Sequence, residues 1–382
     1  MSNMPDKVYL ITPSYNKNIR KGYEGVLKTW AKTINKEIPV QIISLSESSK
    51  NIDNIIIQSS SVNAFQIIFN FICALINNIP FQSNLFFSKK IFNKIRKLDE
   101  IEENSVFIFF TIRCHYLSLA VSKNRKIIHA VDSMLLNFRG KFESEKNILK
   151  KFLYFIEFKR LKYKETLFLK TYERNIFVSS RDINFLELKN ACEIPLVVKS
   201  HSIKDYKISS SKFVIGMSGN FNYSPNINAA YFLIRSILPL LHEDIELRLI
   251  GFNADRFLSE AFQLKNLKIK NNVPSIPEQV KLLDVSIAPM LDGSGMQNKI
   301  IDAMSIGVPV ITNKFGLGSI QAIPDKSIII YDDQESLISS IKRLSKDEAL
   351  LRSIGEEGYK LIQSKYTSKS VSSNIMTVLK ND

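Results

Sequence analysis

DGSGMQNKIIDAMSIGVPVIT, residues 292–312, predicts a glycine-rich loop, a helix and a buried strand in direct succession, which is the repeating unit of an α/β sheet. Gly293 and Gly295 bracket Ser294, so the backbone can come close to a ligand and present N–H groups at the start of the helix that Asn298 opens. An anion such as a phosphate suits that position. The same pattern also fits an ordinary loop–helix–strand unit that binds nothing.

The helix within this stretch has two different faces. Lys299 and Asp302 are three residues apart and share one side, whereas Ile300, Ile301 and Met304 point toward a sheet. We expect Lys299 on the exposed start of the helix. The helix therefore offers charges to a ligand, although a solvated lysine and an acid that complements the helix dipole are the ordinary alternatives.

Predicted strands alternate with helices along the chain, in two series. The first series is Val8–Thr12, Val40–Ser44, Ile55–Gln58, Ser105–Phe110, Lys126–Ala130 and Ile176–Ser179. The second series is Phe213–Met217, Glu246–Ile250, Val285–Pro289, Val308–Ile311 and Ile328–Tyr331. The polar segment Lys199–Ser211 lacks a hydrophobic period and separates the two. We therefore predict two α/β domains, residues 1–200 and 201–365, followed by a closing helix over 366–382.

Three segments resemble motifs of the retaining glycosyltransferases with two Rossmann-like domains. Gly295–Met304 is similar to the pattern Gly-x-Gln-Asn-Lys-x-x-Glu-Ala-Met, and Gly219–Asn226 to Gly-Asn-x-x-Tyr-x-Pro-Asn. His129–Ser133, together with Arg139, resembles an Asp-x-x-Asp-Ser segment more loosely. The resemblance is strong over residues 210–365 and loose over the first 200.

The resemblance implies the type B glycosyltransferase fold, in which two Rossmann-like domains face each other across a cleft and the last helix returns to the first domain. The donor would be a nucleotide-sugar, bound by Gly219, Asn220, Gly293, Ser294, Gly295, Gln297, Asn298, Lys299 and Asp302. Lys299 would offset the diphosphate charge of the leaving group, and Asp302 would accept hydrogen bonds from ribose hydroxyls, so we expect both at the catalytic centre. Asp302 stands where the family carries Glu, and Asp292 is not an established equivalent of the family's second acid.

The acceptor side of the site is expected at the carboxyl edge of the first sheet. Arg113 follows the strand Ser105–Phe110, and Asp132 follows the strand that ends at Ala130. We expect Arg113, Asp132 and Ser133 to contact the acceptor. The alternative for Arg113 is a surface arginine paired with a nearby acid.

Metal-ligand and disulfide spacings are not seen in the sequence. His115 and His129 fit partly buried structural roles, and Cys73, Cys114 and Cys192 are far apart and odd in number, which suits a reducing cytoplasm. The first residues show no secretion signal. We therefore expect a cytoplasmic enzyme without a metal or a cofactor, since the nucleotide-sugar is a substrate.

Positive charge is concentrated in the first domain. Residues 1–200 carry 31 Lys and Arg against 18 Asp and Glu, whereas residues 201–382 carry 21 against 19. The segments 89–97 and 150–164 interleave cations with apolar residues at helical spacing, which is typical of a helix on an anionic membrane surface. Solvated helices whose aromatic residues pack inward are the alternative. We expect peripheral contact with the inner face of the cytoplasmic membrane, and no nucleic acid, because no RNA- or DNA-binding signature is present.

Residues 62–81 carry no charge but are not expected to span a membrane. Asn63, Gln66, Asn70 and Asn77 form a polar stripe that a lipid-exposed span would not carry. We expect an amphipathic helix that covers the first sheet.

The resemblance implies a retaining glycosyltransferase that moves a sugar from a nucleotide-sugar to a hydroxyl of a lipid-linked or membrane-bound saccharide, in the assembly of a bacterial surface polysaccharide such as lipopolysaccharide. A nucleotide-sugar epimerase of the same fold would need a cluster of His, Asp and Glu at the strand ends, which the sequence does not show. A non-catalytic basic scaffold or a nucleic-acid-binding protein would not need the intact loops Gly219–Pro225 and Gly295–Lys299.

Overall fold

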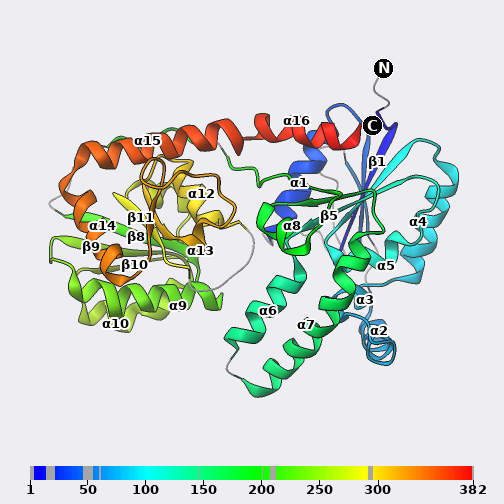
Figure 1. Ribbon diagram of the computed structural model, residues 1–382, viewed down its shortest axis with the longest axis horizontal. Helices are drawn as coiled ribbons and strands as arrows, with labels where there is room; N and C mark the ends of the chain where they lie inside the picture. Colours follow the sequence, from blue (N-terminus) through cyan, green and yellow to red (C-terminus); the bar gives the residue numbers. More distant parts are fainter. Residues whose placement is uncertain are drawn as a thin grey trace. The chain divides into compact units, whose positions relative to one another are not determined.

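The computed structural model describes residues 4–13, 22–45, 55–59, 62–145, 147–199, 201–206, 212–290 and 296–380. The chain divides into two compact units, the first comprising Met1–Val197 and Ser368–Asp382, the second Val198–Thr367. Each unit is built on a parallel sheet with helices packed against it (Figure 1). The predicted α/β fold class is confirmed.

The first unit contains a seven-stranded sheet in the order β3-β2-β1-β4-β5-β6-β7. Its strands are β1 (Lys7–Thr12), β2 (Val40–Ser44), β3 (Ile56–Ser59), β4 (Ser105–Phe110), β5 (Arg125–Val131), β6 (Arg174–Phe177) and β7 (Ala191–Glu193). Its helices are α1 (Gly22–Ile34), α2 (Ala64–Ile76), α3 (Phe81–Asn84), α4 (Lys89–Ile101), η1 (Ile112–Cys114), α5 (His115–Ser118), α6 (Met134–Ser144), α7 (Ile148–Leu169), α8 (Ser180–Leu186) and α16 (Ser368–Leu379).

Both faces of this sheet are buried, because successive residues of each strand point to opposite sides. In β1, Tyr9 and Ile11 enter one apolar cluster, whereas Val8 and Leu10 enter the other. The second cluster also contains Trp30 of α1 and residues of α16, so the last helix completes the core of the first unit.

The second unit contains a six-stranded sheet in the order β10-β9-β8-β11-β12-β13. Its strands are β8 (Phe213–Asn220), β9 (Ile245–Phe252), β10 (Leu267–Asn271), β11 (Val285–Ala288), β12 (Val310–Asn313) and β13 (Ile329–Tyr331). Its helices are α9 (Ser224–Phe232), η2 (Leu233–Ile237), η3 (Leu238–Leu240), η4 (Ala254–Phe257), α10 (Leu258–Gln263), α11 (Ile276–Lys281), α12 (Asn298–Met304), α13 (Lys314–Leu317), α14 (Gln334–Lys346) and α15 (Glu348–Lys365).

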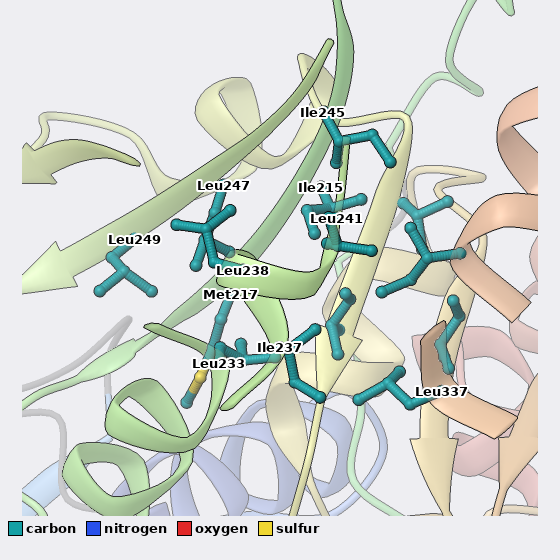
Figure 2. Packing of buried hydrophobic residues seen from close by; sticks show 14 of the residues in the cluster. Ile215, Met217, Leu233, Ile237, Leu238, Leu241, Ile245, Leu247, Leu249 and Leu337 are labelled. Atoms are coloured by element: carbon teal, nitrogen blue, oxygen red, sulfur yellow. The ribbon is translucent and has the colours of Figure 1, made fainter. Parts of the chain in front are cut away.

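Strand and helix residues interdigitate in the core of the second unit. Figure 2 shows Met217 and Leu247 of the sheet beside Leu233, Ile237 and Leu238 of the helical segment that follows β8. This packing explains why the chain after β8 stays helical as far as Leu240.

Helix α2 is not the sheet-covering helix that its polar stripe predicts. Its polar residues face the protein: Asn70 is buried and its Nδ2 donates to the carbonyl oxygens of Leu85 at 3.2 Å and Phe87 at 2.9 Å. Most of its apolar residues are exposed instead. Figure 1 shows α2 at the periphery of the first unit, beyond α3 and away from the strands. Across the described ranges, no helix combines the length and apolar character needed to cross a bilayer.

The two basic segments lie on α4 and α7, but they are not uniformly solvated. Lys89, Lys90 and Lys150 are exposed. Arg160 is buried, and its guanidinium donates to Asn78 Oδ1 at 3.2 Å and to the carbonyl oxygen of Ile79 at 3.3 Å. Arg160 therefore holds the turn after α2 rather than facing a surface.

Candidate functional site

The order of strands in the second sheet defines where a ligand can bind. Strand β8 lies between β9 and β11, and the chain turns to one side of β8 for β9 and to the other side for β11. Open α/β sheets bind ligands outside the carboxyl ends of the strands at such a switch point. The ends of β8 and β11 are therefore the candidate site in this unit.

Gly219 and Asn220 are the last residues of β8, whereas the sequence places them in a loop. A Cβ atom on Gly219 would lie 2.9 Å from Nδ2 of Asn226, which is closer than ordinary contacts allow. The side chain of Asn226 occupies that space and donates from Nδ2 to the carbonyl oxygen of Asn220 at 2.9 Å. A glycine at 219 is thus required for the amide of Asn226 to reach the strand end.

Lys299 lies on α12, and its side chain is half-buried rather than fully exposed as expected. Its Nζ donates to Asn226 Oδ1 at 2.5 Å and lies 3.4 Å from the Sδ of Met290, which follows β11. Burial lowers the pKa of Lys299 to about 8. The amine at the ends of β8 and β11 therefore loses its proton more readily than an exposed lysine. An anionic ligand bound beside it would favour the protonated, charged form.

Asn226 is the residue that the sequence interpretation missed. It is buried near the start of α9, and its two amide atoms connect Lys299 to Asn220. The signal was present, because the segment Gly219–Asn226 ends on it. Nothing in the spacing alone shows which of the polar residues in that segment turns inward.

Asp302 lies one turn after Lys299 on α12 and is exposed, as is Asn298, the first residue of the helix. Gln297 precedes the helix and its side chain makes no capping hydrogen bond there. The apolar side of the helix is buried as predicted, with Ile300 and Ile301 in the core. Asp292, Gly293, Ser294 and Gly295 lie outside the described residues.

The first unit brings Arg113 and Asp132 to the ends of the adjacent strands β4 and β5. Thr111 and Val131 precede them with φ angles of 64° and 70°, which are strained for β-branched residues and are typical of functional sites. Arg113 is half-buried, and its Nε donates to Gln82 Oε1 at 2.9 Å. This neutral partner differs from the acid that the alternative interpretation assigns to Arg113.

Asp132 is held in place within its own loop. Its Oδ2 accepts a hydrogen bond from Asn137 Nδ2 at 2.9 Å. Burial raises the pKa of Asp132, while the hydrogen bond from Asn137 and the positive charge of Arg113 act in the opposite direction. The positive charge of Arg113 therefore acts on Asp132, and both residues follow adjacent strands at the same edge of the sheet.

Ser133 is fully buried, which differs from the expectation that its hydroxyl faces a ligand. It begins α6 as the N-cap, and its Oγ accepts from Leu136 N at 3.2 Å and donates to Glu165 Oε2 at 3.2 Å. Glu165 also accepts from the backbone N–H groups of Met134 and Leu135. Ser133 therefore shapes the loop that carries Asp132.

Two buried carboxyl groups near this loop were not found from the sequence. Burial raises the pKa of Glu165 to about 7, against the hydrogen bonds that it accepts. Burial also raises the pKa of Asp182 to about 7, and the negative charge of Asp132 adds to that shift. Both residues lie within helices, where no motif distinguishes a buried acid from a solvated one.

His115 and His129 are more deeply buried than expected and have structural roles. His115 stacks on Phe168, and His129 packs against Trp30 and Phe110. Burial lowers the pKa of each to about 3, so both rings are neutral at pH 7. Within the described part of the chain, no three His, Cys, Asp or Glu side chains are grouped as a metal site would need.

Residues 212–347 match the family model of the glycosyl transferases group 1. A curated relative is an uncharacterized 44.6 kDa protein in the cps region of Klebsiella pneumoniae, which is 23% identical over 297 residues, covering 73% of this chain and 76% of that protein. The family match lies in the second unit and contains both Asn226 and Lys299.

The fold of the whole chain is similar to that of several solved structures. TarM superposes with a TM-score of 0.71 at 10% identity, with 98% of each chain covered. HepE from Anabaena, solved with UDP and glucose, has a TM-score of 0.68 at 11% identity, with 98% of this chain and 99% of that chain covered. Sucrose-phosphate synthase from Thermosynechococcus elongatus has a TM-score of 0.67 at 12% identity, with 98% of each chain covered. The predicted two-domain type B glycosyltransferase fold is confirmed.

Proposed function

We propose that this protein, a glycosyltransferase with a group 1 domain at residues 212–347, moves a sugar with retention of configuration from a nucleotide-sugar to a hydroxyl of a membrane-bound saccharide. The observation that carries the proposal is the position of Lys299. Its amine is held by Asn226 where β8 and β11 end, at the switch point of the sheet.

The donor is proposed to bind at these strand ends. Gly219 and Asn220 are proposed to offer backbone groups at the end of β8, Lys299 offers the cation, and Asp302 offers a carboxylate to the ribose hydroxyls. Gln297 and Asn298 adjoin Lys299 and are proposed to bind the donor with it. Gly293, Ser294 and Gly295 are proposed to bind the donor because the family resemblance implies that role. HepE was solved with UDP and with UDP-glucose, which supports a nucleotide-sugar donor here.

In the proposed chemical step, the cation of Lys299 lies beside the diphosphate that leaves the donor sugar. The bond between the anomeric carbon and the diphosphate oxygen breaks, and the acceptor oxygen bonds to that carbon on the same face. The acceptor proton passes to the departing diphosphate. Lys299 stabilises the charge that develops on the diphosphate, an effect that is large in a site partly shielded from water. The proposed step uses no metal ion or cofactor.

The acceptor is proposed to contact Arg113 and Asp132. A guanidinium binds phosphate or carboxylate groups of a saccharide carrier, and a carboxylate accepts hydrogen bonds from sugar hydroxyls. Ser133 supports this loop, so we retain it as a positioning residue only. TarM of S. aureus was solved with UDP and saccharide ligands, which supports a saccharide acceptor.

The setting is proposed to be the assembly of a surface polysaccharide, either capsule or lipopolysaccharide, at the inner face of the cytoplasmic membrane. The Klebsiella relative in a cps region supports the first of these. The basic excess of residues 1–200 supports an anionic membrane surface that carries a lipid-linked acceptor.

Thermal unfolding with UDP, GDP and dTDP tests the donor. A ligand bound only by the folded protein stabilises it by RT ln(1 + [L]/Kd), about 2.7 kcal/mol at one hundred times Kd. We expect one base to be preferred, and Lys299→Met to weaken the effect. Lys346→Ala is a matched control, because Lys346 is an exposed lysine at the end of α14 and does not follow a strand of the site.

Product analysis separates the remaining alternatives. With the preferred nucleotide-sugar and a saccharide acceptor, NMR should show the same anomeric configuration in donor and product. An inverted product would contradict retention, and an epimerised nucleotide-sugar would establish the epimerase. No stabilisation by any of the three nucleotides would favour a non-catalytic scaffold.

A further inference from the structure

Helix α2 is fastened to the protein by polar groups and presents apolar groups to the outside. Asn70 and Ala74 are the residues that it buries. Phe65 is 87% exposed, Phe69 65% and Ile76 77%. With Ile68, Ile72 and Leu75, which are also exposed, they recur every three or four residues and form one stripe along the whole helix.

The polar side chains of α2 bind the neighbouring segment, and those at its two ends bind the helix itself. Gln66 Nε2 and Asn70 Nδ2 both donate to the carbonyl oxygen of Phe87, and Asn63 Oδ1 accepts from Gln66 N as the N-cap. At the other end Asn77 Nδ2 donates to the carbonyl oxygen of Cys73. A helix with capped ends has few backbone groups that still need water, which suits an apolar surrounding.

Cations follow α2 closely in the chain, beginning just after the segment that its polar side binds. Phe87, to which α2 is bonded, is followed after one residue by the start of α4. The first two turns of α4 carry Lys89, Lys90, Lys94 and Arg96 and no acid, and α2 itself carries no charge. An uncharged apolar helix followed in the chain by a lysine-rich helix matches an anionic lipid surface, in which acyl chains lie beneath negatively charged head groups.

A lipid surface fits this helix better than a folded partner. Exposure is not confined to the stripe, because Ile67 on another side of the helix is 42% exposed. A protein partner would need a groove that encloses most of the helix, whereas fluid acyl chains surround the helix without preformed shape. We propose that α2 lies in the plane of an anionic membrane with its stripe inserted at the boundary of head groups and acyl chains. This proposal rests on the membrane-bound acceptor proposed above.

An added tryptophan on the stripe reports insertion directly. Trp30 is the only tryptophan in the chain and is fully buried, so its emission is a constant background. Phe69→Trp should shift its emission to shorter wavelength when vesicles of phosphatidylcholine with phosphatidylglycerol are added, and lipids brominated on the acyl chain should quench it. Phe262→Trp is the control, because Phe262 is also exposed but lies in the second unit, and its emission should not change.

Removing the stripe should weaken binding. Phe65→Ser and Ile76→Ser should each lower vesicle partitioning by roughly tenfold or more, since each removes a large apolar side chain from the lipid. Phe262→Ser, 89% exposed against 87% for Phe65, is the matched control and should bind as the wild type does. Lys89→Gln and Lys90→Gln should lower partitioning by about fivefold per charge, chiefly at low salt.

Thermal unfolding checks that each variant is folded, and the nucleotide-dependent stabilisation tests the donor site separately. If the wild type pellets with vesicles but Phe69→Trp neither shifts nor is quenched, the membrane contact lies elsewhere and α2 insertion is wrong. If the shift appears without lipid and rises with protein concentration, α2 pairs with a second copy of the chain, which also overturns the proposal. If nucleotides stabilise a protein that ignores vesicles, the donor proposal stands and the membrane proposal falls.

Discussion

The Nζ of Lys299 donates to Oδ1 of Asn226, which lies 73 residues earlier in the chain, at 2.5 Å. The Nδ2 of the same Asn226 donates to the carbonyl oxygen of Asn220 at 2.9 Å. The buried amide of Asn226 therefore fixes the position of the Lys299 amine relative to the end of β8. The proposed donor site depends on this amide.

Asn226→Ala should lower both stability and turnover. Loss of a buried amide leaves Lys299 without its acceptor, and a buried polar group without a partner costs about 1–3 kcal/mol. Urea unfolding should show this loss, and steady-state kinetics should show a turnover reduced by roughly tenfold or more, because the amine is no longer aimed. Asn228→Ala changes an exposed residue of the same helix and serves as the control. Equal kinetics for the two variants would remove Asn226 from the site.

Lys299→Ala should retain the fold and slow transfer by about 10²-fold, the usual effect of removing one preorganised group that stabilises developing charge. Circular dichroism would establish the fold and single-turnover kinetics the rate. Lys346→Ala, at an exposed lysine at the end of α14, should turn over as the wild type does. A wild-type rate in folded Lys299→Ala would show that this amine does not act on the leaving group.

Nucleotide binding should take up protons near pH 8. The pKa of Lys299 is lowered to about 8 by burial, so about half of the molecules carry a neutral amine there, and a bound diphosphate favours the charged form. Calorimetry in two buffers of different ionisation enthalpy should show an uptake of up to about half a proton per nucleotide. The uptake should vanish in Lys299→Met. An unchanged uptake in that variant would assign the proton to another group.

Asp302→Ala should weaken nucleotide binding by roughly 1.5–3 kcal/mol, the value of hydrogen bonds to a charged group. Asp302→Glu should bind at least as well as the wild type, because the longer carboxylate keeps the charge and extends the reach. Isothermal calorimetry measures both. Unchanged affinity in Asp302→Ala would leave this residue with a role in the helix dipole alone.

Asp182 should make stability depend on pH. Its pKa is raised from 3.8 to about 7 by burial, so the folded state holds a proton that the unfolded state has lost between these values. The stability that protonated Asp182 contributes to the folded state is therefore fully present below about pH 4. This stability is lost as the pH rises through about 7. The difference in unfolding free energy between wild type and Asp182→Asn should fall over that range in urea titrations. A constant difference would contradict a raised pKa.

Much of the fold could be predicted because buried parallel strands are continuous apolar runs. Val40–Ser44 and Ser105–Phe110 have the predicted bounds. Strands β7 and β10 were missed because each lies at a sheet edge and is only partly buried, so Ala191–Glu193 and Leu267–Asn271 carry little apolar signal.

The site and the surface were less predictable, because both depend on which way a polar side chain turns. Lys299 was recognised by its motif, but its half-buried position depends on Asn226, and only tertiary contact shows that pairing. Helix α2 shows the same limit. Its polar stripe was found, but periodicity cannot tell whether the polar or the apolar side faces the protein, and here backbone carbonyls of residues 85 and 87 bind the polar side.

Helix α16 makes the first unit discontinuous in the chain. Val371, Ile375 and Leu379 pack in the same apolar cluster as Trp30, and Arg125 Nη1 donates to the carbonyl oxygen of Leu379 at 2.7 Å. A ribosome therefore releases nearly all of the second unit before the residues that close the first core have been made. The first unit must therefore wait with an open apolar face until α16 has been made, and apolar surface exposed in this way makes a folding intermediate prone to aggregate.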